Sequence, residues 1–256
     1  MNVAKFFFHP DFDPFLEKEY RRKSFDYAFD PGQSVKHLVE ALGVPHTEIH
    51  HILINGKPVK FSYQVQDADF VDIFPYSAPH HYPPMISSKE SGEVECNHCF
   101  VLDNHLGKLA SYLRLMGFDC LYRNDYQDEE LAQVSHDENR ILLTRDQHLL
   151  MRNAVLRGYW VHSKIPRQQV QEVLDRFNLY DSIQPFRRCA KCNSVLAPVS
   201  KDKILNRLEP LTRRYFNEFR ICPSCKQIYW KGSHYKKILT FIDEISNGSN
   251  HLIRDS

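Results

Sequence analysis

Apolar and polar positions in the first 75 residues predict short strands around a single helix. Residues 24–29 alternate aromatic with small or polar side chains, which is typical of a half-buried strand. Ser34 is placed to cap a helix that ends at Gly43, and Asn55-Gly56 is a hairpin-turn pair. This order of elements predicts a β-grasp domain over residues 1–76. The expected strands are residues 3–8, 24–29, 51–54, 57–59 and 70–74.

The pattern changes after residue 95, where short, wholly apolar runs alternate with helical stripes. Such runs indicate strands of a parallel sheet that is covered on both faces. Residues 95–185 are therefore expected to form a three-layer parallel α/β domain, because each strand is followed by a helix. The expected strands are residues 100–102, 120–122, 141–144 and 158–161.

Three aspartates fall at or near the ends of these strands. Asp103 and Asp146 each follow an apolar run, and Asp128 precedes the next helix. The carboxyl ends of parallel strands share one edge of a sheet, so we expect the three carboxylates to hold Mg²⁺ or Mn²⁺ there. Lys108 and Arg145 are near enough to contact phosphate. The alternative for each acid is structural, since an aspartate also caps a helix.

The C-terminal part of the chain is strongly basic. Residues 186–237 carry 13 Lys/Arg against 3 Asp/Glu, although the whole chain has a net charge of only +1. A charge block of this kind favours a polyanion such as nucleic acid, and the alternative is a solvated surface. Arg213 and Arg214 lie within it as candidate RNA contacts. Residues 77–94 are rich in proline and serine, which predicts a linker.

Six of the seven cysteines occur in Cys-x-x-Cys pairs. Two of these pairs match the knuckles of a tetrahedral zinc site, which is structural because four sulfurs close it. The predicted ligands are Cys189, Cys192, Cys222 and Cys225. We expect a zinc ribbon with a C-terminal helix over residues 186–246, then a disordered tail at 247–256. Cys96 and Cys99 lack a second pair nearby, and we interpret them as an incidental pair.

Several classes of protein are disfavoured. No apolar run approaches the ~18 residues of a membrane span, and the first residues lack a signal-peptide pattern. A Gly-rich phosphate loop is also missing from the sequence. We therefore expect a cytoplasmic protein that does not enter a membrane.

The acid-bearing region contains the motifs Phe100–Asp103, Leu106–Ala110, Leu113–Asp119, Asp128–Leu131 and Leu142–Asp146. Together these motifs resemble a known family, the PIN-like RNase domain at the C terminus of the Mut-seven exonucleases. Bacterial forms often add a ubiquitin-like N-terminal domain and end in a zinc ribbon. The resemblance implies that Asp103, Asp128 and Asp146 are the metal-binding acids of a nuclease. Asn104 stands where the family often has Glu, which removes one acidic ligand.

The N-terminal domain also resembles the sulfur-carrier proteins of thiamine and molybdopterin synthesis, through residues 54–56 and 67–73. Those carriers end in Gly-Gly, whereas this chain continues through Pro75, so we disfavour carrier chemistry. A module that binds a protein partner is the better interpretation.

Two functions follow. The first is a metal-dependent ribonuclease, a hydrolase whose catalytic acids are the three aspartates and whose zinc ribbon binds RNA. The second is a non-catalytic RNA- or ribosome-binding adaptor with a degenerate acid site, which Asn104 favours. The sequence leaves open which RNA is cut, endo- or exonuclease action, and the oligomeric state.

Overall fold

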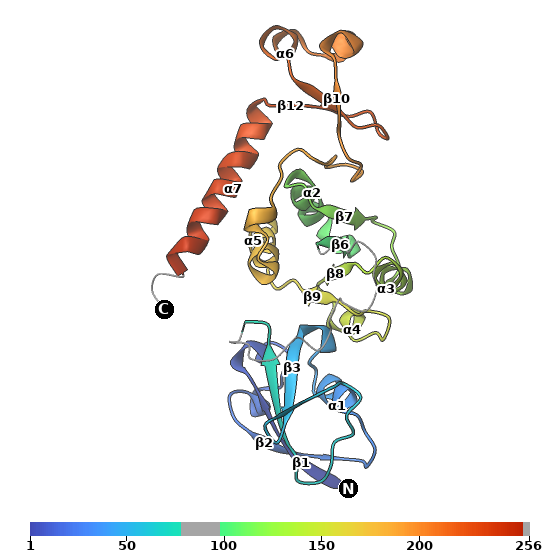
Figure 1. Ribbon diagram of the computed structural model, residues 1–256, viewed down its shortest axis with the longest axis vertical. Helices are drawn as coiled ribbons and strands as arrows, with labels where there is room; N and C mark the ends of the chain where they lie inside the picture. The colour runs from blue at the N-terminus through green and yellow to red at the C-terminus, as the bar shows by residue number, and fades with distance from the viewer. Residues whose placement is uncertain (78–97, 253–256) are drawn as a thin grey trace. The chain divides into compact units, whose positions relative to one another are not determined.

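The computed structural model describes residues 1–77 and 98–252. These residues form a five-stranded sheet, a four-stranded sheet and a three-stranded sheet with associated helices (Figure 1). The chain divides into two compact units, Met1–Asn97 with Gln127–Trp160, and His98–Tyr126 with Val161–Ser256. The predicted linker lies outside the described residues except for its first position, and so does Cys96.

The first unit begins with the five-stranded sheet, in the order β2-β1-β5-β3-β4. Strand β1 pairs in parallel with β5, while the β1–β2, β3–β4 and β3–β5 pairs are antiparallel. This arrangement confirms the predicted N-terminal sheet domain. Its strands are β1 (Asn2–Phe8), β2 (Phe25–Phe29), β3 (Ile49–Ile54), β4 (Lys57–Val59) and β5 (Phe70–Pro75), and its helices are η1 (Pro10–Phe12), η2 (Lys18–Tyr20), α1 (Val35–Ala41) and η3 (His46–Glu48).

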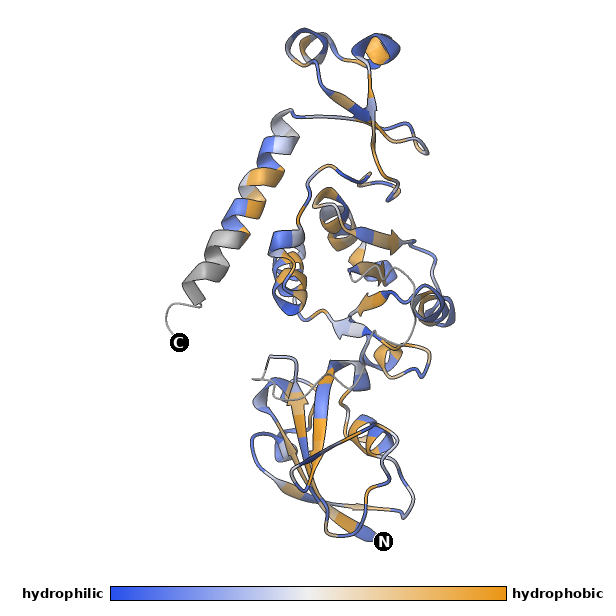
Figure 2. Cartoon of the chain, viewed as in Figure 1, coloured by the Kyte–Doolittle hydropathy of each residue, from blue (hydrophilic) through white to orange (hydrophobic). Residues whose placement is uncertain are grey.

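Local sequence chemistry explains these elements. The hydroxyl of Ser34 accepts from the amide of His37 at 3.3 Å, so the predicted cap of α1 is confirmed. Asn55 and Gly56 both have positive φ, 52° and 78°, as a tight primed hairpin turn requires. Phe6 and Phe8 lie on the buried face of β1 and stack with Phe25. Figure 2 shows the resulting apolar colour along the strands of this sheet.

The first unit also contains part of the α/β region. Strands β8 (Ile141–Thr144) and β9 (Gly158–Trp160) pair in parallel, and α3 (Asp128–Asp137) and α4 (Gln147–Leu150) belong with them. Packing favours Gly158, because a Cβ there would lie 2.5 Å from Leu150 Cδ2 and 3.2 Å from the Leu142 carbonyl oxygen. The predicted strand–helix alternation is therefore present.

The N-terminal domain packs on this α/β segment through buried polar contacts. Nε2 of His46 contacts the Val155 carbonyl at 2.8 Å, and a carboxylate oxygen of Glu48 accepts from the Trp160 amide at 2.6 Å. The Phe15 and Trp160 rings lie beside these contacts with centroids 5.0 Å apart. The sheet domain thus has a partner within its own chain.

The second unit holds the other strands of the parallel sheet, β6 (Cys99–Leu102) and β7 (Asp119–Tyr122), which pair in parallel. The full strand order of this sheet is β7-β6-β8-β9. The prediction of a parallel α/β sheet is confirmed. The other elements here are η5 (Asn104–Leu106), α2 (Gly107–Leu115), α5 (Pro166–Phe177) and η6 (Tyr180–Ser182).

The ribbon follows as an antiparallel sheet of order β10-β11-β12. The last helix continues through Leu252, so the tail predicted to be disordered from residue 247 is helical over most of its length. Its sequence ends the apolar stripe earlier, but helix geometry persists past Gly248. The ribbon elements are β10 (Ala197–Val199), η7 (Lys201–Arg207), α6 (Pro210–Tyr215), β11 (Phe219–Ile221), β12 (Ile228–Trp230) and α7 (Ser233–Leu252).

Candidate metal centre and strand-end aspartates

The four ribbon cysteines converge on one point. Their sulfurs all lie within 4.8 Å of one another, with Cys189 and Cys225 at 3.5 Å and Cys192 and Cys222 at 3.3 Å. A tetrahedral zinc with Zn–S bonds of ~2.3 Å would separate its sulfurs by about 3.8 Å. The cluster therefore fits such an ion, and the predicted group of four cysteines that could hold a metal such as zinc is confirmed.

Hydrogen bonds around the sulfurs prepare them for a cation. The Cys225 amide donates to the sulfur of Cys222 at 3.4 Å. The Tyr229 hydroxyl accepts from the Ala190 amide at 3.0 Å and lies 3.1 Å from the sulfur of Cys189, so its proton is free to reach that sulfur. Outer contacts of this kind orient metal ligands.

The thiols also differ in acidity. Burial opposes ionisation of Cys192, but hydrogen bonds from Ser194 and the Cys222 thiol outweigh it and lower the pKa of Cys192 to about 6. Burial and the neighbouring thiols raise the pKa of Cys225 to about 12. Four adjacent thiolates repel one another, and a divalent cation removes that conflict because it is shared by all four sulfurs.

The first knuckle is locked to strand β7 by buried polar side chains. Arg114, 4% exposed, donates to the Cys120 carbonyl at 2.8 Å and to the Lys191 carbonyl at 3.0 Å. Asn193 accepts from the Cys120 amide at 3.0 Å and donates to Asp119 at 2.8 Å. The side-chain amide thereby satisfies an edge-strand backbone group, and the ribbon is fixed to the α/β region.

Asp146 and Asp128 occupy helix starts in the first unit. Asp146 caps α4, since its Oδ1 accepts from the His148 amide at 2.8 Å, which is the structural alternative considered for this acid. The cap of α3 is Gln127, so the prediction that Asp128 caps this helix is wrong; Asp128 is its first residue. Nη2 of Arg152 lies 3.8 Å from Asp128 and 2.9 Å from Glu129, so both acids have a cation nearby.

Asp103 lies in the second unit, directly after β6. It is 7% exposed and makes no side-chain capping bond to η5. Metal-binding side chains are those of His, Cys, Asp and Glu. Within residues 1–77 and 98–252, the four cysteines are the one group of three or more such side chains whose ligand atoms lie close enough together to hold a metal. A shared metal site of the three aspartates therefore stays a prediction.

The predicted phosphate contacts are distributed over three helices or loops. Lys108 is exposed on α2. Arg145 receives a bond at its carbonyl from the Trp160 indole at 3.1 Å, and its Nε has no protein partner in the described part of the chain. Arg213 and Arg214 are exposed on α6. Arg145 itself is half-buried, so the four residues differ in exposure, and their contact with phosphate stays a prediction.

Sequence reasoning missed several residues. Arg114 and Asn193 lie in segments interpreted only as a helix and a knuckle, and nothing in the local pattern marks their long-range bonds. Cys99, interpreted as part of an incidental pair, is disulfide-bonded. Trp230 packs against the apolar cluster of the ribbon and also lines an open cavity there.

Fold and site together define an α/β protein with an N-terminal ubiquitin-like sheet, a parallel sheet and a four-cysteine centre. Two family models match it, the Mut7-C RNAse domain over residues 98–242 and the Mut7-C ubiquitin domain over residues 1–81. The chain belongs to the Mut7-C RNAse domain family.

Searches of curated proteins and of solved structures found no significant match. In the described residues, no helix is both long and apolar enough to cross a membrane. Family membership supports a nuclease-like or RNA-related role, and the RNase domain points to RNA as the substrate class.

Proposed function

We propose that the chain is a ribonuclease that uses Mg²⁺ or Mn²⁺ and hydrolyses phosphodiester bonds of RNA in the cytoplasm. The observation that carries this proposal is the RNAse-domain match over residues 98–242, which contains all three strand-end aspartates. Asp103 follows β6 and Asp146 follows β8, and parallel strands deliver such residues to one edge of a sheet.

Asp103, Asp128 and Asp146 would hold the ion, and carboxylate oxygens are the ligands that these hard cations prefer. Such an ion would activate water and neutralise charge on the phosphodiester. The cap on α4 fixes the orientation of Asp146, because one of its oxygens is held by the His148 amide. Arg145 and Lys108 would position the phosphate, and Arg152 would balance the charge of Asp128 and Glu129.

The ribbon supplies binding rather than chemistry in this proposal. Four sulfurs leave no open position on a zinc ion, so the metal is structural. The surrounding segment has 13 Lys/Arg against 3 Asp/Glu, and Arg213 and Arg214 are exposed on it. Arginine and lysine in this density hold an RNA backbone through its phosphates.

The test is cleavage of end-labelled RNA by the zinc-loaded full chain in Mg²⁺ or Mn²⁺. Asp103→Asn and Asp146→Asn are expected to reduce cleavage to background while keeping the zinc content and thermal unfolding of the wild type. The matched control is Asp137→Asn, an exposed acid at the end of α3, which should cleave like wild type. Equal cleavage by all variants, or no cleavage of any RNA by wild type, would rule the proposal out.

The second candidate is a non-catalytic RNA- or ribosome-binding adaptor. Asn104, and the pairing of Arg152 with Glu129, favour it, because both reduce the negative charge available to a metal. Asn104→Glu separates the two functions. A nuclease should bind Mn²⁺ more tightly and retain or gain cleavage, whereas an adaptor should bind RNA equally well after all three aspartates are changed to Asn.

A further inference from the structure

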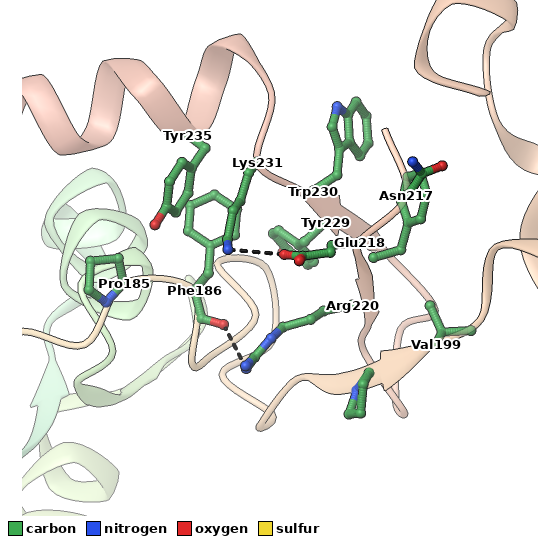
Figure 3. A pocket seen from close by; sticks show the side chains of 12 residues that line it. Pro185, Phe186, Val199, Asn217, Glu218, Arg220, Tyr229, Trp230, Lys231 and Tyr235 are labelled. Carbon is green, nitrogen blue, oxygen red and sulfur yellow. Dashed lines mark hydrogen bonds and ion pairs between the residues drawn. The ribbon is translucent and has the colours of Figure 1, made fainter. Parts of the chain in front are cut away.

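A cavity of about 390 Å³ opens within the ribbon, beside β11 and β12 (Figure 3). Three separate parts of the chain line it: the segment that enters the ribbon, the strands, and the first turn of α7. Its volume is within the range of ~300–1,000 Å³ that is typical of pockets for small ligands. Four half-buried aromatic side chains contribute to the walls, namely Phe186, Tyr229, Trp230 and Tyr235.

These rings do not form a closed core. Phe186 meets Tyr235 edge to face, with centroids 4.7 Å apart at 71°, and Tyr229 at 5.9 Å and 87°. A second cavity of about 270 Å³ shares Phe186, Tyr229 and Trp230 with the first. Protein cores leave few voids larger than a water molecule, so open space beside these rings sets them apart from core residues. Aromatic side chains with open space on more than one side can stack with another flat ring.

The backbone of Phe186 adopts a strained conformation that places its ring at the cavity. Its φ is 61°, a left-handed conformation that is a genuine outlier for a bulky residue. The Phe186 amide donates to the Leu115 carbonyl at 3.0 Å, and its carbonyl accepts from Arg220 at 3.4 Å. These two bonds hold the ring at the cavity, although a glycine would adopt this backbone without strain.

Cations flank the aromatic walls. Arg220 and Lys231 line the cavity and are exposed, and Lys231 pairs with Glu218 at 3.0 Å (Figure 3). Flat apolar walls next to positive groups match a ligand that combines an aromatic ring with a phosphate. Single-stranded nucleic acid has this combination, since its bases stack on aromatic side chains while its phosphates meet Lys and Arg.

We propose that this pocket binds one unstacked base of single-stranded RNA. The base stacks on the aromatic walls, and the adjoining phosphates contact Arg220 and Lys231. The inference rests on RNA being the substrate in the proposed function, and it names where the strand is held. Tyr229 joins this pocket to the metal centre, because its ring lines the cavity while its hydroxyl contacts Cys189. The zinc centre therefore helps to position one wall.

The experiment measures binding of a fluorescently labelled single-stranded 12-mer RNA to the zinc-loaded full chain. It uses an Asp146→Asn background without added Mg²⁺ or Mn²⁺, with intact RNA verified on a gel afterwards. Tyr235→Ala and Trp230→Leu should each weaken binding about tenfold, as loss of one stacked base does. Tyr215→Ala is the matched control, an aromatic 65% exposed on α6 outside the pocket, and should bind like the parent.

A second pair of variants, at two exposed lysines, separates a loss of RNA binding from a folding defect. Lys231→Ala should weaken binding more than Lys236→Ala, an exposed lysine of α7 that does not line the cavity. An RNA with one abasic position in every three should lose affinity for the parent but not for Tyr235→Ala. Equal binding by parent and pocket variants, with retained zinc, overturns the pocket. Pocket effects on binding without any cleavage by wild type would leave the pocket standing and overturn the nuclease proposal.

Discussion

The ubiquitin-like domain and the cysteine ribbon are both small sheets, but different forces hold them together. The first buries 17 apolar residues in one cluster rich in phenylalanine. The apolar cluster of the ribbon has four buried members, Ile204, Leu208, Phe219 and Ile228, and a separate group surrounds the cysteines. A core of that size offsets little of the conformational entropy of the ribbon, so we expect a metal at the four cysteines to supply the missing stability.

The two regions also attach to the α/β region by similar means. Each uses buried polar side chains that bond to backbone groups, Glu48 to the Trp160 amide in one case and Arg114 to the Lys191 carbonyl in the other. Such bonds are specific in direction and costly to leave unmade. The contacts that stabilise each region internally therefore differ from the contacts that attach it to the α/β region. A mutation can disrupt either set without disrupting the other.

Removal of the metal should have the largest effect and should act on the ribbon alone. Structural zinc contributes ~10–16 kcal/mol of binding free energy in small zinc peptides, so a chelator or Cys192→Ser should unfold the ribbon. Trp230 reports the ribbon and Trp160 reports the first unit, so the Trp160→Phe and Trp230→Phe variants separate their fluorescence. Cys120→Ala is the control and should keep one zinc per chain. An unchanged Trp230 spectrum after chelation would contradict the prediction.

Truncation of the aromatic core should destabilise the ubiquitin-like domain and leave the ribbon intact. Phe6 is fully buried, and Phe6→Ala should lower the free energy of unfolding of the ubiquitin-like domain by about 3–5 kcal/mol through lost burial and a cavity. Urea unfolding followed by Trp160 fluorescence measures this loss. The zinc content should stay at one per chain; a loss of zinc would mean that the two regions are not independent.

The next largest loss of stability is expected when the contacts that attach the ribbon to strand β7 are removed. Asn193→Ala leaves the Cys120 amide without its side-chain acceptor and should cost about 1–3 kcal/mol. Hydrogen exchange should rise at the Cys120 amide while zinc remains bound. Ser224→Ala, an exposed change on the second knuckle, is the control and should leave this exchange rate unaltered.

The attachment of the ubiquitin-like domain should respond to a comparable degree. Glu48→Ala removes the acceptor of the partly buried Trp160 amide and should cost about 1–3 kcal/mol of stability in the first unit. Glu48→Gln keeps an acceptor oxygen and should recover most of the loss. If Gln and Ala behave alike in thermal unfolding, the hydrogen bond is not the source of the effect.

The smallest effect is expected at the surface of the sheet domain. Lys5 and Asp26 form an ion pair at 2.9 Å with side chains 50% and 65% exposed. Exposed pairs of this kind contribute ~0–1 kcal/mol, and salt screens them. Lys5→Ala should therefore change the midpoint of urea unfolding barely at all. A large change would show that this side chain does more than pair with Asp26.

The sequence by itself determined most of the elements, because the signals for them are local. The alternation in 24–29, the Ser34 cap and the Asn55-Gly56 turn predicted elements that the structure contains. The spacing of the cysteines likewise predicted a four-sulfur group, since each knuckle is a short turn. In each case the determining residues lie within a few positions of one another.

Tertiary structure decided the partners. Asn193 bonds to Cys120 across 73 positions, and Glu48 bonds to Trp160 across 112, so no periodicity or turn signal records either contact. The pocket likewise needs Phe186 and Tyr235, which adjoin only after the ribbon has folded. Local chemistry selects helices, strands and knuckles, whereas buried polar bonds and cavity walls depend on the path of the whole chain through space.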